Sequence, residues 1–419
     1  GREKPAMPPE GNEAPKASEI AVIKQWIEAG AKGPSGKAPD PTILVTPKEP
    51  RNMPNNMSDV ESEVIAVSDD VGMNRLHDSA SIETHTGKQA SQGDREEFAP
   101  IPQFHPCHGG TLSYLWRDRR LDVAHAALPF VFHNVVPTPC QGGGFLGGAF
   151  DPFRVTVDPD KQHYVAEELA IRQELPVQRI GSRRELLTSL QTARSKSQVG
   201  FDQFYEKAYQ LLGSEKVRRA LDISEETPEM RDRYGVLPAN TPGAGVARHM
   251  RGQNLLVARR LVEAGVPYVQ VNWSEYVESV TPNCDFGWDT HIYNFELLQD
   301  THCPIFDRAF SALLDDLRTR GLIDSTLVVA MGEFGRTPRI NSRAARDHWS
   351  RCYFSLWSGG GVQPGRVIGT SDRYAEDPVT TAITPKMVGT TIAELAGVDT
   401  QARAEMRGLD GGTVIQELL

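Results

Sequence analysis

The stretch STLVVAMGEFGRTP, residues 325–338, decides how this chain is expected to fold. It opens with a short apolar run rich in β-branched residues, which is typical of a buried strand. The segment before it, residues 294–323, contains good helix formers at amphipathic spacing and predicts a long helix. A helix that leads directly into a buried strand is typical of a crossover unit, in which successive strands of one sheet run parallel.

The same alternation of helices and strands continues on both sides of this stretch. Strands are predicted at residues 128–137, 266–273 and 352–360, and a closing helix at residues 384–398. Residues 161–264 are predicted to be mainly helical, with breaks at glycine and proline. The predicted fold class is therefore α/β, with a mostly parallel sheet flanked by helices and a poorly ordered N-terminal region.

Composition divides the 419 residues into three parts. Residues 1–33 form a small unit with one short amphipathic helix. Residues 34–104 are dominated by Pro, Ser, Asp, Asn and Gly and are predicted to be a disordered linker, in which His77 and His85 are interpreted as loop histidines. Residues 105–419 have the composition of a globular domain.

Charge, hydropathy and cysteine spacing exclude several classes of protein. The net charge is −10 without any basic block, which argues against nucleic-acid binding, and the pairs Arg183-Arg184 and Arg259-Arg260 are interpreted as ordinary helix surface. No apolar run reaches about 18 residues, so no membrane span is expected. The five cysteines show neither CxxC nor CxxCH, so no disulfide framework or zinc ribbon is predicted. The chain opens without an apolar segment, so no signal peptide is expected.

Two polar segments follow two of the predicted strands. One comes after residues 266–273 and the other after residues 325–332. In open parallel sheets, ligands gather beyond the carboxyl ends of the strands, so these segments are expected to converge. Asp, Glu and His are the ligand types for zinc, manganese and magnesium. The predicted metal ligands are Asp289, His291, Glu333, Asp347 and His348.

The second segment also offers groups that could hold an anion. Arg336 and Arg339 suit a bidentate fork on an anionic group, and Thr337 adds a hydroxyl. The alternative interpretation is an ordinary solvated loop, in which the Asp-His pair caps the following element and Arg336 pairs with Glu333. The sequence leaves both open. No GxSxG elbow occurs, so no catalytic nucleophile is assigned.

Four blocks of this sequence closely resemble the domain-of-unknown-function family numbered 1501, and the resemblance spans about residues 105–419. They are QGGGFLGGAFDPF (141–153), GWDTHIYNF (287–295), GEFGRTPRIN (332–341) and RDHW (346–349). This family is grouped with the alkaline-phosphatase-like fold, which includes phosphatases and sulfatases. Members of that broader group bind two metals through Asp and His, including an adjacent Asp-His pair that matches Asp347 and His348 here.

The resemblance implies a metal-dependent hydrolase of phosphate or sulfate esters. Its substrate would be a small-molecule or polysaccharide ester, its cofactor zinc, manganese or another divalent ion, and its location the periplasm. The family usually begins with a strand and a WGGPSHIDTFDPK-like segment that supplies an early Asp and the nucleophile region. Residues 40–104 contain no counterpart. The alternative is therefore a non-catalytic exported binding or structural protein that retains the fold.

The first 33 residues carry a second resemblance. MPPEG and SEIAVIKQWIEAGAKGP are similar to the end of a planctomycete-type cytochrome c domain, in which the Met of MPP is the axial haem ligand. That residue would be Met7. Because CxxCH is absent from this chain, haem is not expected.

Overall fold

The structure is a computed structural model of the chain. It describes residues 63–67, 76–90, 93–95, 98, 104–129, 131, 137–155, 214–236, 246–273, 288–291, 293–405 and 411–419. The chain divides into two units, residues 1–55 and 56–419, and every described residue belongs to the second. The predicted N-terminal unit and the predicted helices between residues 161 and 213 lie outside the described residues.

A small parallel sheet has the strand order β3-β2-β4. These strands are β3 (Phe153–Arg154), β2 (Ala126–Leu128) and β4 (Val269–Val271), and both pairings are parallel. β4 lies inside the strand predicted at residues 266–273. β2 begins and ends earlier than the strand predicted at residues 128–137. It ends before Pro129, which has no amide hydrogen to donate to a neighbouring strand.

A second sheet has the order β5-β8-β1-β9 and is mixed. β8 (Tyr353–Ser358) pairs antiparallel with both β5 (Val328–Met331) and β1 (Glu63–Val67), whereas β1 and β9 (Val367–Ile368) are parallel. The α/β class is therefore confirmed, but the mostly parallel sheet is found only in the three-stranded sheet. The reason is the connection from β5 to β8, residues 332–352, which contains no helix and lets the chain turn back beside itself.

The stretch predicted to be a linker contains β1 and helix α2 (His77–Thr86). β1 has a partner strand on each side, and nearly every residue of α2 is buried. The interpretation of His77 and His85 as loop histidines is wrong, because both lie in α2. Hydrophobic patterning misses this helix because its buried positions are mostly Ser, Thr, His, Asp and Glu, which hydrogen bond in the interior instead of packing as apolar groups.

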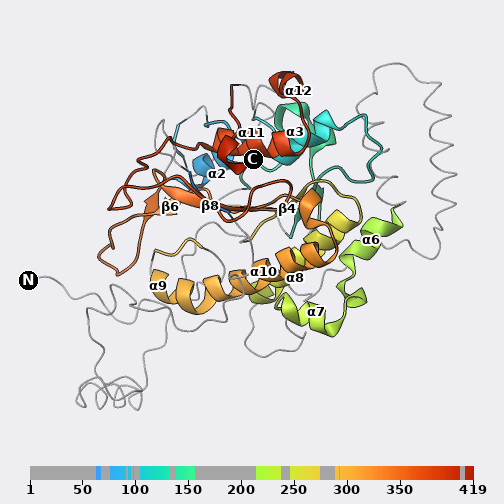
Figure 1. Ribbon diagram of the computed structural model, residues 1–419, viewed down its shortest axis with the longest axis horizontal. Helices are drawn as coiled ribbons and strands as arrows, with labels where there is room; N and C mark the ends of the chain where they lie inside the picture. The colour runs from blue at the N-terminus through green and yellow to red at the C-terminus, as the bar shows by residue number, and fades with distance from the viewer. Residues whose placement is uncertain are drawn as a thin grey trace, which may run out of the picture. The chain divides into compact units, whose positions relative to one another are not determined.

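Helices cover both faces of the sheets (Figure 1). α8 (Val246–Glu263) and α10 (Cys303–Thr319) lie together on one face, and α2, α3 (His108–Leu115) and α11 (Pro385–Leu395) lie on the other. The largest buried cluster contains side chains of α8, α10 and the parallel sheet. The described part of residues 56–419 is thus layered as helix, sheet and helix.

The remaining elements are short. They are α6 (Glu215–Leu221), α7 (Pro228–Arg233), α9 (Asn294–Leu297), α12 (Thr400–Glu405), β6 (Gly335–Arg336), β7 (His348–Trp349), a π-helical turn (Leu298–His302) and five 3-10 turns (Gly144–Leu146, Gly148–Phe150, Ile223–Glu225, Ile323–Ser325 and Gln416–Leu418). The helix predicted at residues 294–323 is therefore α9, the π turn and α10 in succession. Across the described residues, every helix is too short or too polar to cross a lipid bilayer.

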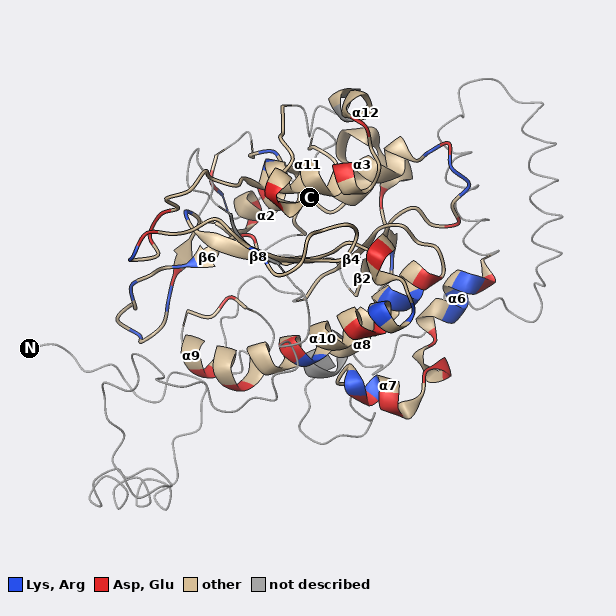
Figure 2. Ribbon diagram, in the orientation of Figure 1, with Lys and Arg blue, Asp and Glu red and all other residues tan. Residues whose placement is uncertain are grey.

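Both basic and acidic side chains lie along α6, α7 and α8 (Figure 2). The sequence interpretation of Arg259 and Arg260 as helix surface is wrong: both are buried. Each forms ion pairs with Glu226, at 2.6 Å from Arg259 Nη2 and 2.5 Å from Arg260 Nη1. The local sequence cannot distinguish a buried Arg-Arg dipeptide from a solvated one, because the carboxylate that pairs with both arginines comes from a different segment of the chain.

Candidate metal centre

The polar connection between β5 and β8 folds into a hairpin. β6 pairs antiparallel with β7, and Arg336 lies directly opposite His348. Residues that face each other across two strands have their side chains on the same face, about 5 Å apart, so these two groups reach the same place. Gly335 allows the hairpin to lie close to the start of β8, since a Cβ added there would be 2.5 Å from the carbonyl oxygen of Cys352.

Asp289 lies at the centre of the site, and its side chain is only 3% exposed. Its Oδ1 is 3.0 Å from His348 Nε2, 3.0 Å from His291 Nε2 and 2.6 Å from Arg336 Nη2. Its Oδ2 is 3.0 Å from His77 Nε2. The two polar segments that follow the predicted strands therefore converge, and α2 adds a third contribution.

Three ligand atoms of this cluster form a triangle. His291 Nε2 and His348 Nε2 are 3.0 Å apart, and each is 3.0 Å from Asp289 Oδ1. Ligand atoms that share one ion at bond lengths near 2.1 Å are separated by about 3.0 Å at a right angle and about 3.4 Å at the tetrahedral angle. The spacing and the chemistry of these donors thus match the ligands of one divalent ion, and we call this triangle the metal-ligand triangle.

His77 joins the cluster from the first residue of α2. His77, Asp289 and His348 each offer a ligand atom within 4.8 Å of the others. The other ring nitrogen of His77, Nδ1, is 2.7 Å from Glu333 Oε1. This is the arrangement in which a carboxylate fixes the orientation of a metal-binding imidazole. Sequence reasoning missed His77, although it is a polar residue that follows a strand-like run, as the other members of the site do.

The protonation of the cluster follows from these contacts. Burial alone would raise the pKa of the Asp289 carboxyl, but hydrogen bonds from His291, His348 and His77 hold that pKa well below its usual range. Burial alone would lower the pKa of His77, but its hydrogen bonds to Asp289 and Glu333 raise it to about 9. The hydrogen bond to Asp289 likewise raises the pKa of His291. A divalent cation that bound here would compete with these protons.

Asp347 lies one layer further out than the metal-ligand triangle. Its Oδ1 is 2.9 Å from His291 Nδ1 and accepts a hydrogen bond from Asn341 Nδ2 at 3.1 Å. The hydrogen bond from His291 lowers the pKa of Asp347. Asp347 therefore orients His291, as Glu333 orients His77, so two of the five predicted metal ligands lie outside the metal-ligand triangle and orient a histidine.

The three predicted anion-binding residues are placed differently from one another. Arg336 belongs to the cluster: its Nη2 contacts Asp289 and donates to the Trp288 carbonyl at 2.9 Å, and its buried Nη1 has no hydrogen-bond partner among the described residues. Thr337 shapes the hairpin, since its hydroxyl donates to the Arg339 carbonyl and accepts from the backbone of Asp347. The Arg339 side chain is 89% exposed, outside the cluster.

The family model described as Protein of unknown function (DUF1501) matches residues 38–419. Because this match covers most of its length, the chain belongs to that family. The matched region begins before β1 and α2, so it includes His77 as well as the later members of the cluster. The comparison with curated proteins gave no match.

Proposed function

We propose that this member of the DUF1501 family is a metal-dependent hydrolase of phosphate or sulfate esters with an alkaline-phosphatase-like fold. The observation that carries the proposal is the metal-ligand triangle of Asp289, His291 and His348, whose atoms are 3.0 Å apart. When neither Nε2 carries a proton, each offers a lone pair, and at this separation both lone pairs can be directed at one cation. The layered fold and the position of the cluster beyond β5 are consistent with the proposal.

In this proposal the described residues have distinct tasks. Asp289, His291 and His348 hold the ion, with His77 as a further ligand. Glu333 orients the imidazole of His77, and Asp347 orients that of His291. A divalent ion held there polarises an ester oxygen and lowers the pKa of a bound water. Arg336 Nη1, which has no partner among the described residues, donates to the anionic oxygens of the ester.

The reaction requires only water as a second substrate. The oxygen of water bonds to the phosphorus or sulfur atom, the bond from that atom to the alcohol oxygen breaks, and a proton passes to the departing oxygen. Asp289 stays ionised throughout, because its hydrogen bonds hold its pKa far below neutral. The substrate is an ester of a small molecule or polysaccharide, and the location that goes with the family resemblance is the periplasm.

The first test is metal content by elemental analysis. The wild-type protein, purified without chelator and reloaded with zinc or manganese, is expected to hold stoichiometric metal, and Asp289→Asn and His348→Ala are expected to lose it. Glu376→Gln serves as the matched control, because it removes a carboxylate near the hairpin but outside the cluster. Wild-type protein without metal after reloading would end the proposal.

A second candidate is a non-catalytic binding or structural protein in which the same ion joins α2, the loop at Asp289 and the hairpin. The burial of Asp289 favours it, since structural metal sites are closed to solvent. Kinetics on aryl phosphate and aryl sulfate esters separate the two. Turnover that disappears with EDTA and in Arg336→Met supports the hydrolase, whereas bound metal without turnover of either ester supports the structural protein.

A further inference from the structure

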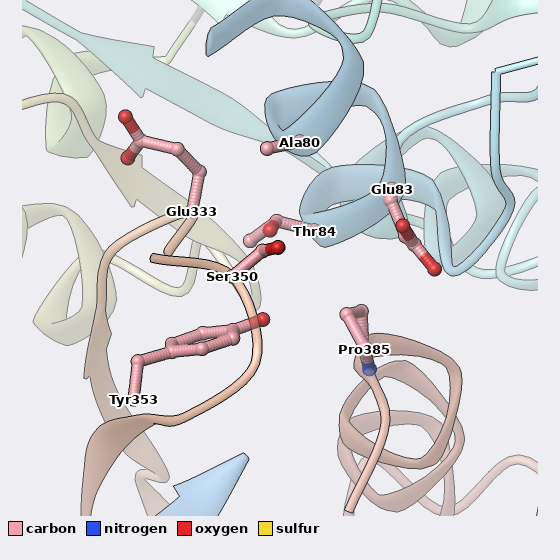
Figure 3. Close-up of a pocket in the computed structure, with 7 residues that line it drawn as sticks. All are labelled: Ala80, Glu83, Thr84, Glu333, Ser350, Tyr353 and Pro385. Atoms are coloured by element: carbon pink, nitrogen blue, oxygen red, sulfur yellow. The ribbon is translucent and has the colours of Figure 1, made fainter. Parts of the chain in front are cut away.

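A small cavity lies behind the His77–Glu333 pair, where α2, the start of α11 and the turn between β7 and β8 meet (Figure 3). Thr84 of α2, together with Ser350 and Tyr353 from the end of the polar connection and the start of β8, lines this space. Their hydroxyl groups are directed toward the same region, and Ala80 and Pro385 close it with apolar groups. Its volume suits about one water molecule.

Two of these hydroxyls have no hydrogen-bond partner within the described part of the chain. Thr84 is 7% exposed and Ser350 is 4% exposed, yet neither Thr84 Oγ1 nor Ser350 Oγ donates to or accepts from any protein atom there. Leaving a buried hydroxyl unpaired destabilises the fold, and buried polar groups in folded proteins are almost always satisfied by protein or by water. Two such groups on one polar cavity therefore point to a shared partner.

We propose that this cavity holds one ordered water that bridges the Thr84 and Ser350 hydroxyls, and that these two residues thereby position the histidines of the metal centre. The two unpaired hydroxyls match water, which uses two to four polar partners, and Glu83 and Glu333 also line the cavity. Because α2 is short and polar, few apolar contacts fix it, and a buried bridge at Thr84 supplies a directional one.

The bridge connects the two elements that carry the opposite sides of the site. Thr84 lies two helical turns after His77 in α2, and Ser350 follows His348 by two residues. The rings of His77 and His348 are 4.4 Å apart, centre to centre. A water that pins Thr84 to Ser350 thus fixes how α2 lies against the hairpin, and hence the separation of these two rings. Thr84 and Ser350 touch neither ion nor substrate, so they are positioning residues.

A double-mutant cycle in the metal-free full chain tests the bridge. Thr84→Val and Ser350→Ala each leave the water with one hydroxyl fewer, and each is expected to lower the equilibrium constant for folding about tenfold in urea titrations. Removing the second hydroxyl after the first is expected to have little further effect, because the bridge is already broken. The equilibrium constant for folding of the double variant is therefore also expected to be about tenfold below that of the wild type. A loss near a hundredfold, the product of two independent effects, would overturn the bridge.

Thr86→Val is the matched control, because Thr86 lies on the same helix but its hydroxyl already donates to the Ile82 carbonyl at 2.6 Å. Combined with Ser350→Ala, its effect is expected to multiply without coupling. A crystal structure provides a second test. One peak of electron density within hydrogen-bond distance of both hydroxyls supports the water, and a cavity without such a peak overturns the proposal. The equilibrium constant for folding is also compared in sodium and in choline salts. A severalfold difference would show that a cation and not a water occupies the cavity, and would overturn the proposal too.

Positioning is tested by zinc affinity, measured by competition with a chelating dye. Ser350→Ala and Thr84→Val are expected to weaken zinc binding about tenfold while Thr86→Val leaves it unchanged. Equal affinity in all variants would overturn the positioning role. The result is distinguishable from a failure of the proposed function, since a wild-type protein that binds no zinc ends that function and the folding cycle still decides on the water.

Discussion

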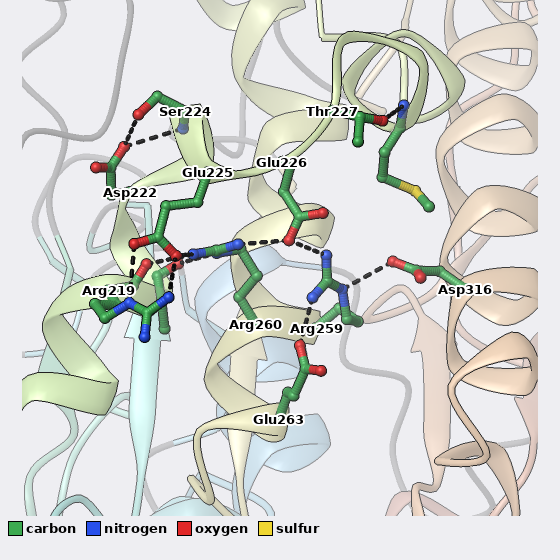
Figure 4. A network of polar contacts seen from close by, with 12 residues as sticks. Arg219, Asp222, Ser224, Glu225, Glu226, Thr227, Arg259, Arg260, Glu263 and Asp316 are labelled. Atoms are coloured by element: carbon green, nitrogen blue, oxygen red, sulfur yellow. Dashed lines mark hydrogen bonds and ion pairs between the residues drawn. The ribbon is translucent and has the colours of Figure 1, made fainter.

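Two clusters of charged side chains in the described part of the chain are buried, and they are built differently. In the first, around Arg259 and Arg260, every contact joins a guanidinium to an oxygen (Figure 4). Arg259 reaches Glu226 at 2.6 Å, Glu263 at 2.6 Å and Asp316 at 2.8 Å. In the second, around Asp289, two imidazole nitrogens face each other at 3.0 Å beside one carboxylate oxygen.

The difference shows what each cluster can do. The arginine cluster is held together by ion pairs, because positive and negative groups alternate between α8, α10 and the segment after α6. The cluster at Asp289 brings together groups that compete for the same protons, which is a poor way to stabilise a fold and a good way to bind a cation. The proposed metal centre rests on this difference: guanidinium and carboxylate groups pair throughout the first cluster, whereas two imidazole nitrogens face each other in the second.

Breaking the arginine cluster is expected to have the largest effect. Arg259→Met removes a side chain that is 0% exposed and takes one ion-pair partner from each of the buried carboxylates Glu226 and Asp316. The free energy of unfolding, measured with urea, is expected to fall by about 3–5 kcal/mol. Arg318→Met is the control: it makes the same change on α10 at a surface pair with Asp315, where less than about 1 kcal/mol is expected. A loss in Arg259→Met no larger than in the control would contradict the comparison.

His108 sharpens the comparison as a buried ionisable group that has no ion pair among the described residues. Burial, helped by the nearby His85, lowers its pKa to about 4, and its Nε2 lies 3.0 Å from the Thr84 carbonyl. In the unfolded chain this histidine takes up its proton near pH 6.5. Between pH 6.5 and 4 the unfolded state therefore binds more protons than the folded state, and the free energy of unfolding decreases as the pH is lowered.

The resulting loss of stability is absent well above pH 6.5, grows as the pH falls through 6.5 and amounts to about 3 kcal/mol at pH 4. Urea titrations of wild type and His108→Gln at pH 7, 5.5 and 4.5 are expected to show the wild type losing stability faster as the pH falls. Parallel pH profiles of the two proteins would show that His108 does not have a depressed pKa.

A smaller effect is expected from the residues that orient the imidazoles. Glu333→Gln keeps the shape of the side chain but weakens its hold on His77 Nδ1, which is 2.7 Å away. Zinc affinity is expected to fall about 10- to 100-fold with the fold intact by circular dichroism. Glu376→Gln is again the control. Unchanged affinity in Glu333→Gln would mean that His77 takes no part in binding the ion.

The sequence predicted the elements whose signal is local. The apolar run at β5 and the amphipathic pattern of α10 were both sufficient, because the first is a continuous run of strand-forming residues and the second buries a face that repeats along its own segment. The convergence of the segments that contain Asp289 and His348 was also predictable, since both follow strands. Their role as metal ligands stays a proposal.

The sequence failed where burial is polar. α2 contains almost no apolar pattern, and Arg259 looks like an ordinary surface residue until Glu226 and Asp316 are seen around it. The partner of His77, Glu333, is 256 positions away along the chain. No local pattern could show that this histidine lies in a helix, or that its ring joins the site.

By itself, then, the sequence determined which segments form the main strands and helices, and which residue types follow them. Only the tertiary structure decided that β8 runs antiparallel to β5, that β1 enters the same sheet and that α2 places His77 beside Asp289. The physical reason is that an apolar face follows from the pattern of neighbouring residues in one segment. The hydrogen-bond partner of a buried polar group, in contrast, comes from whichever distant segment the fold places beside it.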